Sequence, residues 1–150
     1  MCQDPVDAIQ VLALLPSEGD RQSLRDIFVH SNWRLQFVGT LNELRESLES
    51  TQLGVVITDS CLSDSGWKAV LETADRMEGQ PSVIVSSRLA DDRLWAEVLN
   101  LGGFDVLVMP FERAEVLRCV ALAWHAWQDR SKLKRSGSRQ QTLHASGVGF

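Results

Sequence analysis

The residue with the clearest chemical potential is Asp59, which follows the apolar, β-branched run Val55–Thr58. A short apolar run bounded by turn residues is typical of a strand that is buried on both faces of a parallel sheet. Open parallel sheets bind ligands at the carboxyl ends of their strands, where this carboxylate would lie. The alternative is that Asp59 only begins a turn, because Ser, Asp and Gly residues follow it as far as Gly66.

Cys61, two residues after Asp59, is the nearest candidate nucleophile. A redox role is one interpretation, but no histidine is close to Cys61 in sequence, and a buried structural cysteine is the favoured alternative. The three histidines are dispersed, and no group of residues has the spacing of metal ligands. These residue types therefore do not predict a metal site.

The elements that would position Asp59 are strands and helices in strict alternation. Strands are predicted at Ala8–Leu15, Arg34–Val38, Gly54–Thr58, Ser82–Ser86 and Phe104–Val108, and helices at 17–30, 40–50, 66–77, 91–101 and 112–128. Ser17 is a candidate helix cap, and Thr40 with Glu43 forms a capping box.

Such alternation implies right-handed crossovers and helices on both faces of a parallel sheet. We therefore predict an α/β fold, a doubly wound five-stranded parallel sheet of order 2-1-3-4-5 in a flavodoxin-like three-layer sandwich. In that order the first and third strands end side by side. Asp59 would then lie in a crevice beside Leu15, Pro16 and Ser17.

Composition predicts one domain, because the chain has 150 residues and an ordinary apolar fraction of 44%. No apolar run approaches the roughly 18 residues of a membrane span, and the first ten residues have no basic residue, unlike a secretory signal. The three cysteines form no CxxC pair, so we expect free thiols in the reducing cytoplasm.

Charge divides the chain into an acidic body at 1–129 and a basic flexible tail at 130–150. The body holds all twenty acidic residues, whereas the tail is rich in Ser, Gly and basic residues. We expect the last helix to end near Gln128, or at Ser136-Gly137-Ser138 at the latest. Nucleic-acid binding by the tail is not favoured, because the body is acidic.

Over residues 8 to about 128 the chain resembles the receiver domain of bacterial response regulators. The matching stretches are VVITD at 55–59, the Ser-Gly pair at 65–66, PSVIVSS at 81–87 and LGGFDVLVMPF at 101–111. The resemblance implies that Asp59 corresponds to the aspartate that receives a phosphoryl group from a histidine kinase. It also implies that Ser86, or Ser87, matches the family's Thr/Ser, and that Pro110 matches its cis-proline.

The departures from this family concern charge. Receivers carry two or three adjacent acids after the first strand, where this chain has Leu14-Leu15-Pro16-Ser17. The family's lysine is Met109 here, its aromatic switch residue is Val106, and Cys61 stands where the family offers a backbone carbonyl to the metal. Glu18 and Asp20 are nearby acids, but neither is in the family's register.

These losses matter because an aspartate attacks phosphate poorly unless positive charge offsets the repulsion between anions. Mg²⁺ needs several oxygen ligands, usually more than one carboxylate. We therefore expect a degenerate, pseudo-receiver-like acceptor site with no cofactor beyond weakly bound Mg²⁺.

The favoured function is a non-enzymatic module of phosphorelay (two-component) signal transduction that acts through protein contacts. Trp124 and Trp127 widen the apolar face of the last helix and, with Val106, predict a partner face formed by the elements at 91–101, 104–108 and 112–128. The alternative for the tryptophans is a fully covered core helix. We expect a second copy or another protein as partner, with a histidine kinase as a candidate, and no membrane.

Two other functions stay open. One is a genuine phosphoacceptor receiver that uses Asp59. The other is a flavodoxin-like small-ligand binder, which is disfavoured because PSEGD at 16–20 contains no phosphate-cradling glycine loop.

Overall fold

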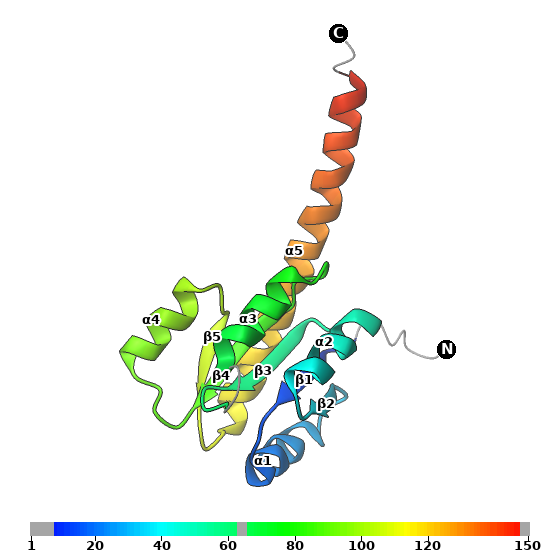
Figure 1. The fold of residues 1–150 in the computed structure, drawn as a ribbon. Coiled ribbons are helices and arrows are strands. Elements are labelled where there is room, and N and C mark those ends of the chain that lie inside the picture. The colour runs from blue at the N-terminus through cyan, green and yellow to red at the C-terminus, as the bar shows by residue number, and fades with distance from the viewer. Residues whose placement is uncertain (1–7, 63–65, 148–150) are drawn as a thin grey trace, which may run out of the picture.

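The computed structural model describes residues 8–62 and 66–147. Within these ranges the predicted alternation is confirmed (Figure 1). The strands are β1 (Gln10–Leu14), β2 (Arg34–Val38), β3 (Val55–Asp59), β4 (Ser82–Ser87) and β5 (Asp105–Val108). The helices are α1 (Glu18–Phe28), α2 (Leu41–Ser50), α3 (Gly66–Arg76), α4 (Asp92–Asn100) and α5 (Arg113–Gly147).

The five strands form one parallel sheet in the predicted order β2-β1-β3-β4-β5. Every residue of β3 and β4 is buried, whereas β2 and β5, at the two edges, are partly exposed. This burial explains why β3 and β4 read as continuous apolar runs, while β2 alternates between apolar and polar residues. Asp59 is the last residue of the central strand.

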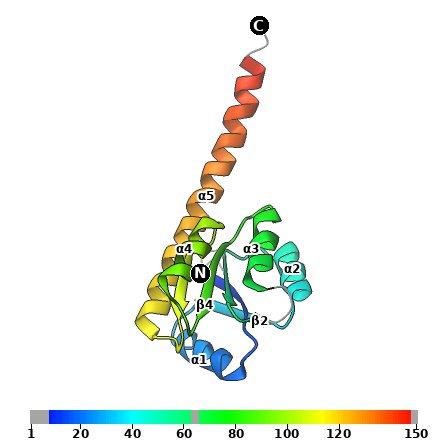
Figure 2. The same cartoon turned by 60° about the vertical axis from the view of Figure 1, so that its left-hand side comes forward.

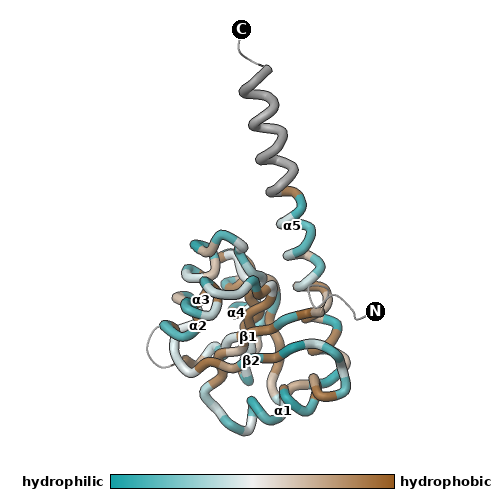
Figure 3. Tube along the Cα trace, turned by 90° about the vertical axis from the view of Figure 1, so that its right-hand side faces the viewer, coloured by the Kyte–Doolittle hydropathy of each residue, from teal (hydrophilic) through white to brown (hydrophobic). Residues whose placement is uncertain are grey.

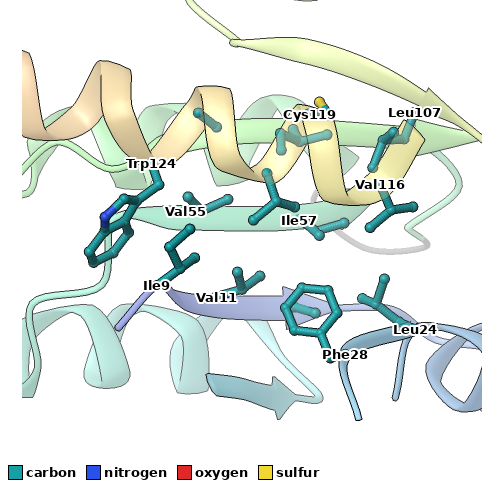
Figure 4. Packing of buried hydrophobic residues seen from close by; sticks show 14 of the residues in the cluster. Ile9, Val11, Leu24, Phe28, Val55, Ile57, Leu107, Val116, Cys119 and Trp124 are labelled. Carbon is teal, nitrogen blue, oxygen red and sulfur yellow. The ribbon is translucent and has the colours of Figure 1, made fainter. Parts of the chain in front are cut away.

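Two apolar layers hold the helices against the sheet. Helices α1 and α5 cover one face, and α2, α3 and α4 cover the other. Figure 2 shows α2 and α3 on the side of the sheet opposite α5. Figure 4 shows the first layer, where Leu24 and Phe28 of α1 and Val116 of α5 pack on Val11 and Ile57 of the strands. Because successive strand residues point to opposite faces, each inner strand supplies both layers.

Local capping interactions fix where the helices begin. The hydroxyl of Ser17 accepts a hydrogen bond from the backbone N–H of Asp20 at 3.4 Å, and that of Thr40 accepts one from Glu43 at 3.1 Å. The Glu43 carboxylate accepts the backbone N–H of Gly39 at 2.6 Å, one residue before the cap. The predicted capping box at α2 is therefore confirmed with this shift.

The predicted end of the last helix is wrong. Helix α5 continues through Ser136-Gly137-Ser138 to Gly147, and Figure 1 shows it extending well away from the body. In Figure 3 the hydrophobic colour gathers in the body, along β1. A single glycine costs a helix only about 1 kcal/mol relative to alanine, and good helix formers such as Lys, Arg and Gln flank this one. Secondary structure therefore crosses the predicted boundary at 129/130 without a break.

Candidate functional site

Asp59 lies at the carboxyl end of β3 with only 4% of its surface exposed. Its Oδ1 accepts a hydrogen bond from the backbone N–H of Cys61 at 2.9 Å. Both readings of the sequence thus apply, because Asp59 begins a turn and also stands at the strand edge where parallel sheets place ligand sites. Its neighbours decide what this carboxylate can do.

Ser86 is the serine that lies beside Asp59, because the two residues pair in register across β3 and β4. The Ser86 hydroxyl donates to the backbone carbonyl of Thr58 at 3.2 Å, and the Ser86 carbonyl accepts from Ser60 at 2.8 Å. The Ser87 hydroxyl instead accepts the backbone N–H of Leu89 at 3.0 Å and so stabilises the turn after β4.

Asp20 is a site residue that sequence reasoning left aside. It lies in the first turn of α1 and is only 5% exposed. Arg88, in the loop after β4, donates from one terminal nitrogen to Asp20 Oδ1 at 2.6 Å and from the other to Oδ2 at 3.2 Å. Such a two-point ion pair is directional and strong, so it fixes both side chains.

Met109 is buried beside this ion pair, with its Sδ 3.9 Å from a terminal nitrogen of Arg88. The Met109–Pro110 peptide bond is cis, which confirms the expectation for Pro110. The guanidinium therefore contacts Met109, which the sequence resemblance aligned with the lysine of receiver domains. Although no lysine stands at this position, the crevice still has a positive charge, which Arg88 supplies from the β4–α4 loop.

The charge on Arg88 acts on more than Asp20. The hydrogen bond to Asp20 and the negative charge of Asp20 raise the pKa of Arg88, desolvation opposes them, and the charges of Asp59 and Cys61 add smaller increases. Arg88 is thus electrostatically coupled to both carboxylates of the crevice. The sequence offered one signal for this role, since a basic residue directly follows a central strand that ends in the crevice.

The crevice does not fit Mg²⁺ as the family binds it. Leu15 and Pro16, after β1, supply no carboxylate, and the Leu15 carbonyl already accepts a hydrogen bond from Arg21 Nε at 2.6 Å. Asp20 is engaged by Arg88 through both oxygens. Among the described residues, no group of three or more His, Cys, Asp or Glu side chains could hold a metal ion.

The two described cysteines differ in environment. Cys61 is exposed, so its assignment as a buried structural cysteine is wrong, because the turn after β3 carries it to the surface. Cys119 of α5 is buried and donates to Asp105 Oδ2 at 3.7 Å. Cys2 lies outside the described residues. Both described thiols are free, as the sequence predicted.

Trp124 and Trp127 do not form an exposed partner face. They are 3% and 9% exposed, their ring centroids lie 4.8 Å apart, and Trp127 Nε1 donates to the carbonyl of Gly79 at 2.9 Å. The pair packs over Gly54 at the start of β3, so the alternative of a covered core helix is confirmed. The wide apolar face of α5 belongs to the core, and Val106 is half-buried.

Other apolar side chains are exposed on the elements of the predicted partner face. They include Trp95 and Leu99 of α4, Val108 of β5 and Leu122 of α5, and we call these four residues the α4–β5–α5 patch. A hydrogen bond of 3.0 Å from Trp95 Nε1 to Asp105 Oδ1 ties α4 to β5, and the Cys119–Asp105 contact ties β5 to α5. These contacts bring the three elements together on one side of the domain.

No protein-family model and no curated protein matches this sequence. Solved structures do match. The signal receiver domain of a putative Luxo repressor protein from Vibrio parahaemolyticus gives a TM-score of 0.75 at 18% identity, over 84% of this chain and 97% of that one. The beryllofluoride-activated NtrC4 receiver domain dimer gives 0.72 at 18% identity, over 79% and 98%.

The response regulator StyR gives a TM-score of 0.79 at 14% identity, over 95% of this chain and 72% of that one. These likenesses show that the chain has the fold of response-regulator receiver domains. Among the described helices, including the long α5, none combines the length and the apolar content that a membrane span requires.

Proposed function

We propose that this chain, which has the receiver fold, is a signalling module of the two-component type that acts through protein contacts and does not rely on Mg²⁺-dependent phosphorylation. The observation that carries the proposal is the surroundings of Asp59. The aspartate and Ser86 stand side by side at the strand ends, while Asp20, an acid in the first turn of α1, is bound by Arg88. Free cysteine thiols agree with a cytoplasmic setting.

The chemistry of phosphoryl transfer explains why these surroundings matter. Transfer to a carboxylate needs fixed positive charge around the moving phosphoryl group, and loss of one such group costs about 10²–10³ in rate. Here two sources are replaced, the acids that hold a metal and the lysine after β5. Arg88 supplies charge, but both of its terminal nitrogens are directed at Asp20.

A phosphorylation assay tests this part of the proposal. The purified chain is incubated with acetyl phosphate, with and without millimolar Mg²⁺, and its intact mass is measured. We expect no phosphoryl adduct under either condition. An adduct that requires Mg²⁺ and is lost in Asp59→Asn would contradict the proposal and establish the alternative, a genuine phosphoacceptor receiver.

We propose the α4–β5–α5 patch as the contact surface, with a second copy of the chain as the partner. Trp95, Leu99, Val108 and Leu122 are large apolar side chains that stand exposed on three adjoining elements. Clustered exposed apolar groups mark interaction surfaces more often than scattered ones do. The NtrC4 receiver, which shares this fold, is described as a dimer.

Sedimentation of surface variants tests this contact. Leu99→Ser combined with Leu122→Ser removes two exposed apolar side chains from the patch, and we expect the double variant to dissociate at concentrations where the wild type is dimeric. Val29→Ser is the matched control, because Val29 is also exposed but lies at the end of α1. A wild-type chain that stays monomeric at high concentration would refute self-association through this surface.

A further inference from the structure

The Asp20–Arg88 pair joins two segments that are 68 residues apart, the first turn of α1 and the loop between β4 and α4. Asp20 is almost fully buried, whereas the Arg88 side chain is 57% exposed. A nearly buried carboxylate needs a partner, since an uncompensated charge in a poorly solvated position is costly. Arg88 satisfies both oxygens of Asp20 from the solvent side.

Asp59 pairs in register with Ser86, two residues before Arg88, and the charge of Asp59 makes a smaller contribution than that of Asp20 to the raised pKa of Arg88. Arg88 directly follows β4, whose end pairs with that of β3, so its ion pair with Asp20 lies at the same edge of the sheet as Asp59. In a receiver, carboxylates at this place hold a divalent metal. Here the compensating charge is covalently part of the chain, and it cannot diffuse away.

We infer that Arg88 is a resident cation of the crevice, which compensates Asp20 and Asp59 in place of a divalent metal and excludes Mg²⁺. This inference rests on the proposed function, and it names Arg88 as the group that takes the place of the metal ion beside Asp59. Two physical effects act together. The guanidinium engages the oxygens of Asp20 that a metal would need, and its charge repels an incoming divalent ion.

Mg²⁺ is a poor competitor in this situation. It loses its hydration water reluctantly and requires near-octahedral oxygen ligands, so it gains little from a crevice in which one of the two carboxylates is occupied. Arginine, by contrast, is weakly hydrated and matches a carboxylate through two parallel hydrogen bonds. Removing Arg88 should therefore release the oxygens of Asp20 as ligands and turn the crevice into a cation site.

Divalent-cation binding to Arg88 variants tests the inference. We would measure Mn²⁺ by the paramagnetic resonance of the free ion and Mg²⁺ by titration calorimetry. Arg88→Ala should bind both ions about tenfold or more tightly than the wild type, from the lost repulsion alone. Arg88→Ala combined with Asp20→Asn should return towards wild-type affinity. Arg88→Gln gives the same comparison if the alanine variant does not fold by circular dichroism.

Arg93→Ala is the matched control, because it removes the same charge from an exposed position in α4. Equal gains in Arg88→Ala and Arg93→Ala would mean a general charge effect and would overturn the inference. So would unchanged binding in Arg88→Ala and Arg88→Gln, or tight Mg²⁺ binding by the wild type. Failure of the proposed function is seen separately, as Mg²⁺-dependent phosphorylation of wild-type Asp59.

Discussion

Gly54, at the start of β3, offers a sharp test of how α5 packs on the sheet. A Cβ atom at this position would lie 2.6 Å from Cε3 of Trp127 and 2.7 Å from Cε3 of Trp124. Both indoles are buried, and neither can withdraw freely. Trp127 is anchored by its hydrogen bond to Gly79, and the Gly54 carbonyl accepts the backbone N–H of Ser82 at 2.8 Å. Gly54→Ala must therefore displace packed side chains or the strand itself.

The magnitude follows from two opposing effects on the free energy of unfolding. Forcing an extra methyl group into a packed core costs about 1–3 kcal/mol. Replacing glycine by alanine also restricts the unfolded chain, which stabilises the native state by about 0.4–1 kcal/mol. The net expectation is a loss of about 1–2 kcal/mol. For a chain of this length that corresponds to a melting temperature lower by roughly 2–8 °C.

Urea denaturation followed by circular dichroism and tryptophan fluorescence measures this loss. Gly19→Ala is the matched control, because the nearest heavy atom to the methyl group it would add is Ser17 Oγ at an ordinary 3.7 Å, and the residue lies in helix α1. Alanine is the better helix former, so this control should be neutral or stabilising. The two substitutions add the same methyl group, and only the packing around it differs.

The same substitution in a Trp124→Leu protein tests whether the indoles cause the loss of stability. If Gly54→Ala acts through the indoles, its penalty should shrink in a Trp124→Leu background, because a smaller side chain leaves room for the methyl group. Contacting residues are expected to show such non-additivity. A Gly54→Ala protein as stable as the wild type, or an equal penalty in both backgrounds, would mean that the tryptophan pair does not rest on β3 as described.

The remaining predictions concern Cys119. Burial raises the pKa of its thiol to about 12, and the Asp105 carboxylate adds to the effect. Alkylation mapped by mass spectrometry should therefore modify the exposed Cys61 in the native protein, and Cys119 only after unfolding. Because this pKa is raised from an ordinary value of 9.0, the free energy of unfolding contributed by the group should be constant below about pH 9 and should fall as the pH rises towards 12. Cys119→Ala should reduce that fall, and an unchanged pH dependence would contradict the assignment.

Local patterns predicted most of the fold because each signal was contained within one segment. The predicted elements lie within a few residues of those observed. Their signals were the alternation of β2, the capping residues Ser17 and Thr40, and the apolar runs of β3 and β4. The end of α5 was missed because Gly137 is a weak breaker that a long helix tolerates. Trp124 and Trp127 were misplaced because an apolar stripe does not show which side a sheet will cover.

Some residues of the candidate site could be predicted from sequence and others could not, for the same physical reason. Asp59 and Ser86 could be placed from sequence, because register between adjacent parallel strands brings their ends together. The Asp20–Arg88 pair could not, since its partners come from a helix turn and a loop separated by 68 residues, and no strand register joins them. A family comparison made position by position records the missing acids after β1 and the missing lysine as simple losses. The structure adds what such a comparison misses: an acid in the first turn of α1 pairs with a cation in the loop after β4. Under the inference drawn above, the Arg88–Asp20 pair keeps a metal away from Asp59, and cation binding by the Arg88 variants tests that directly.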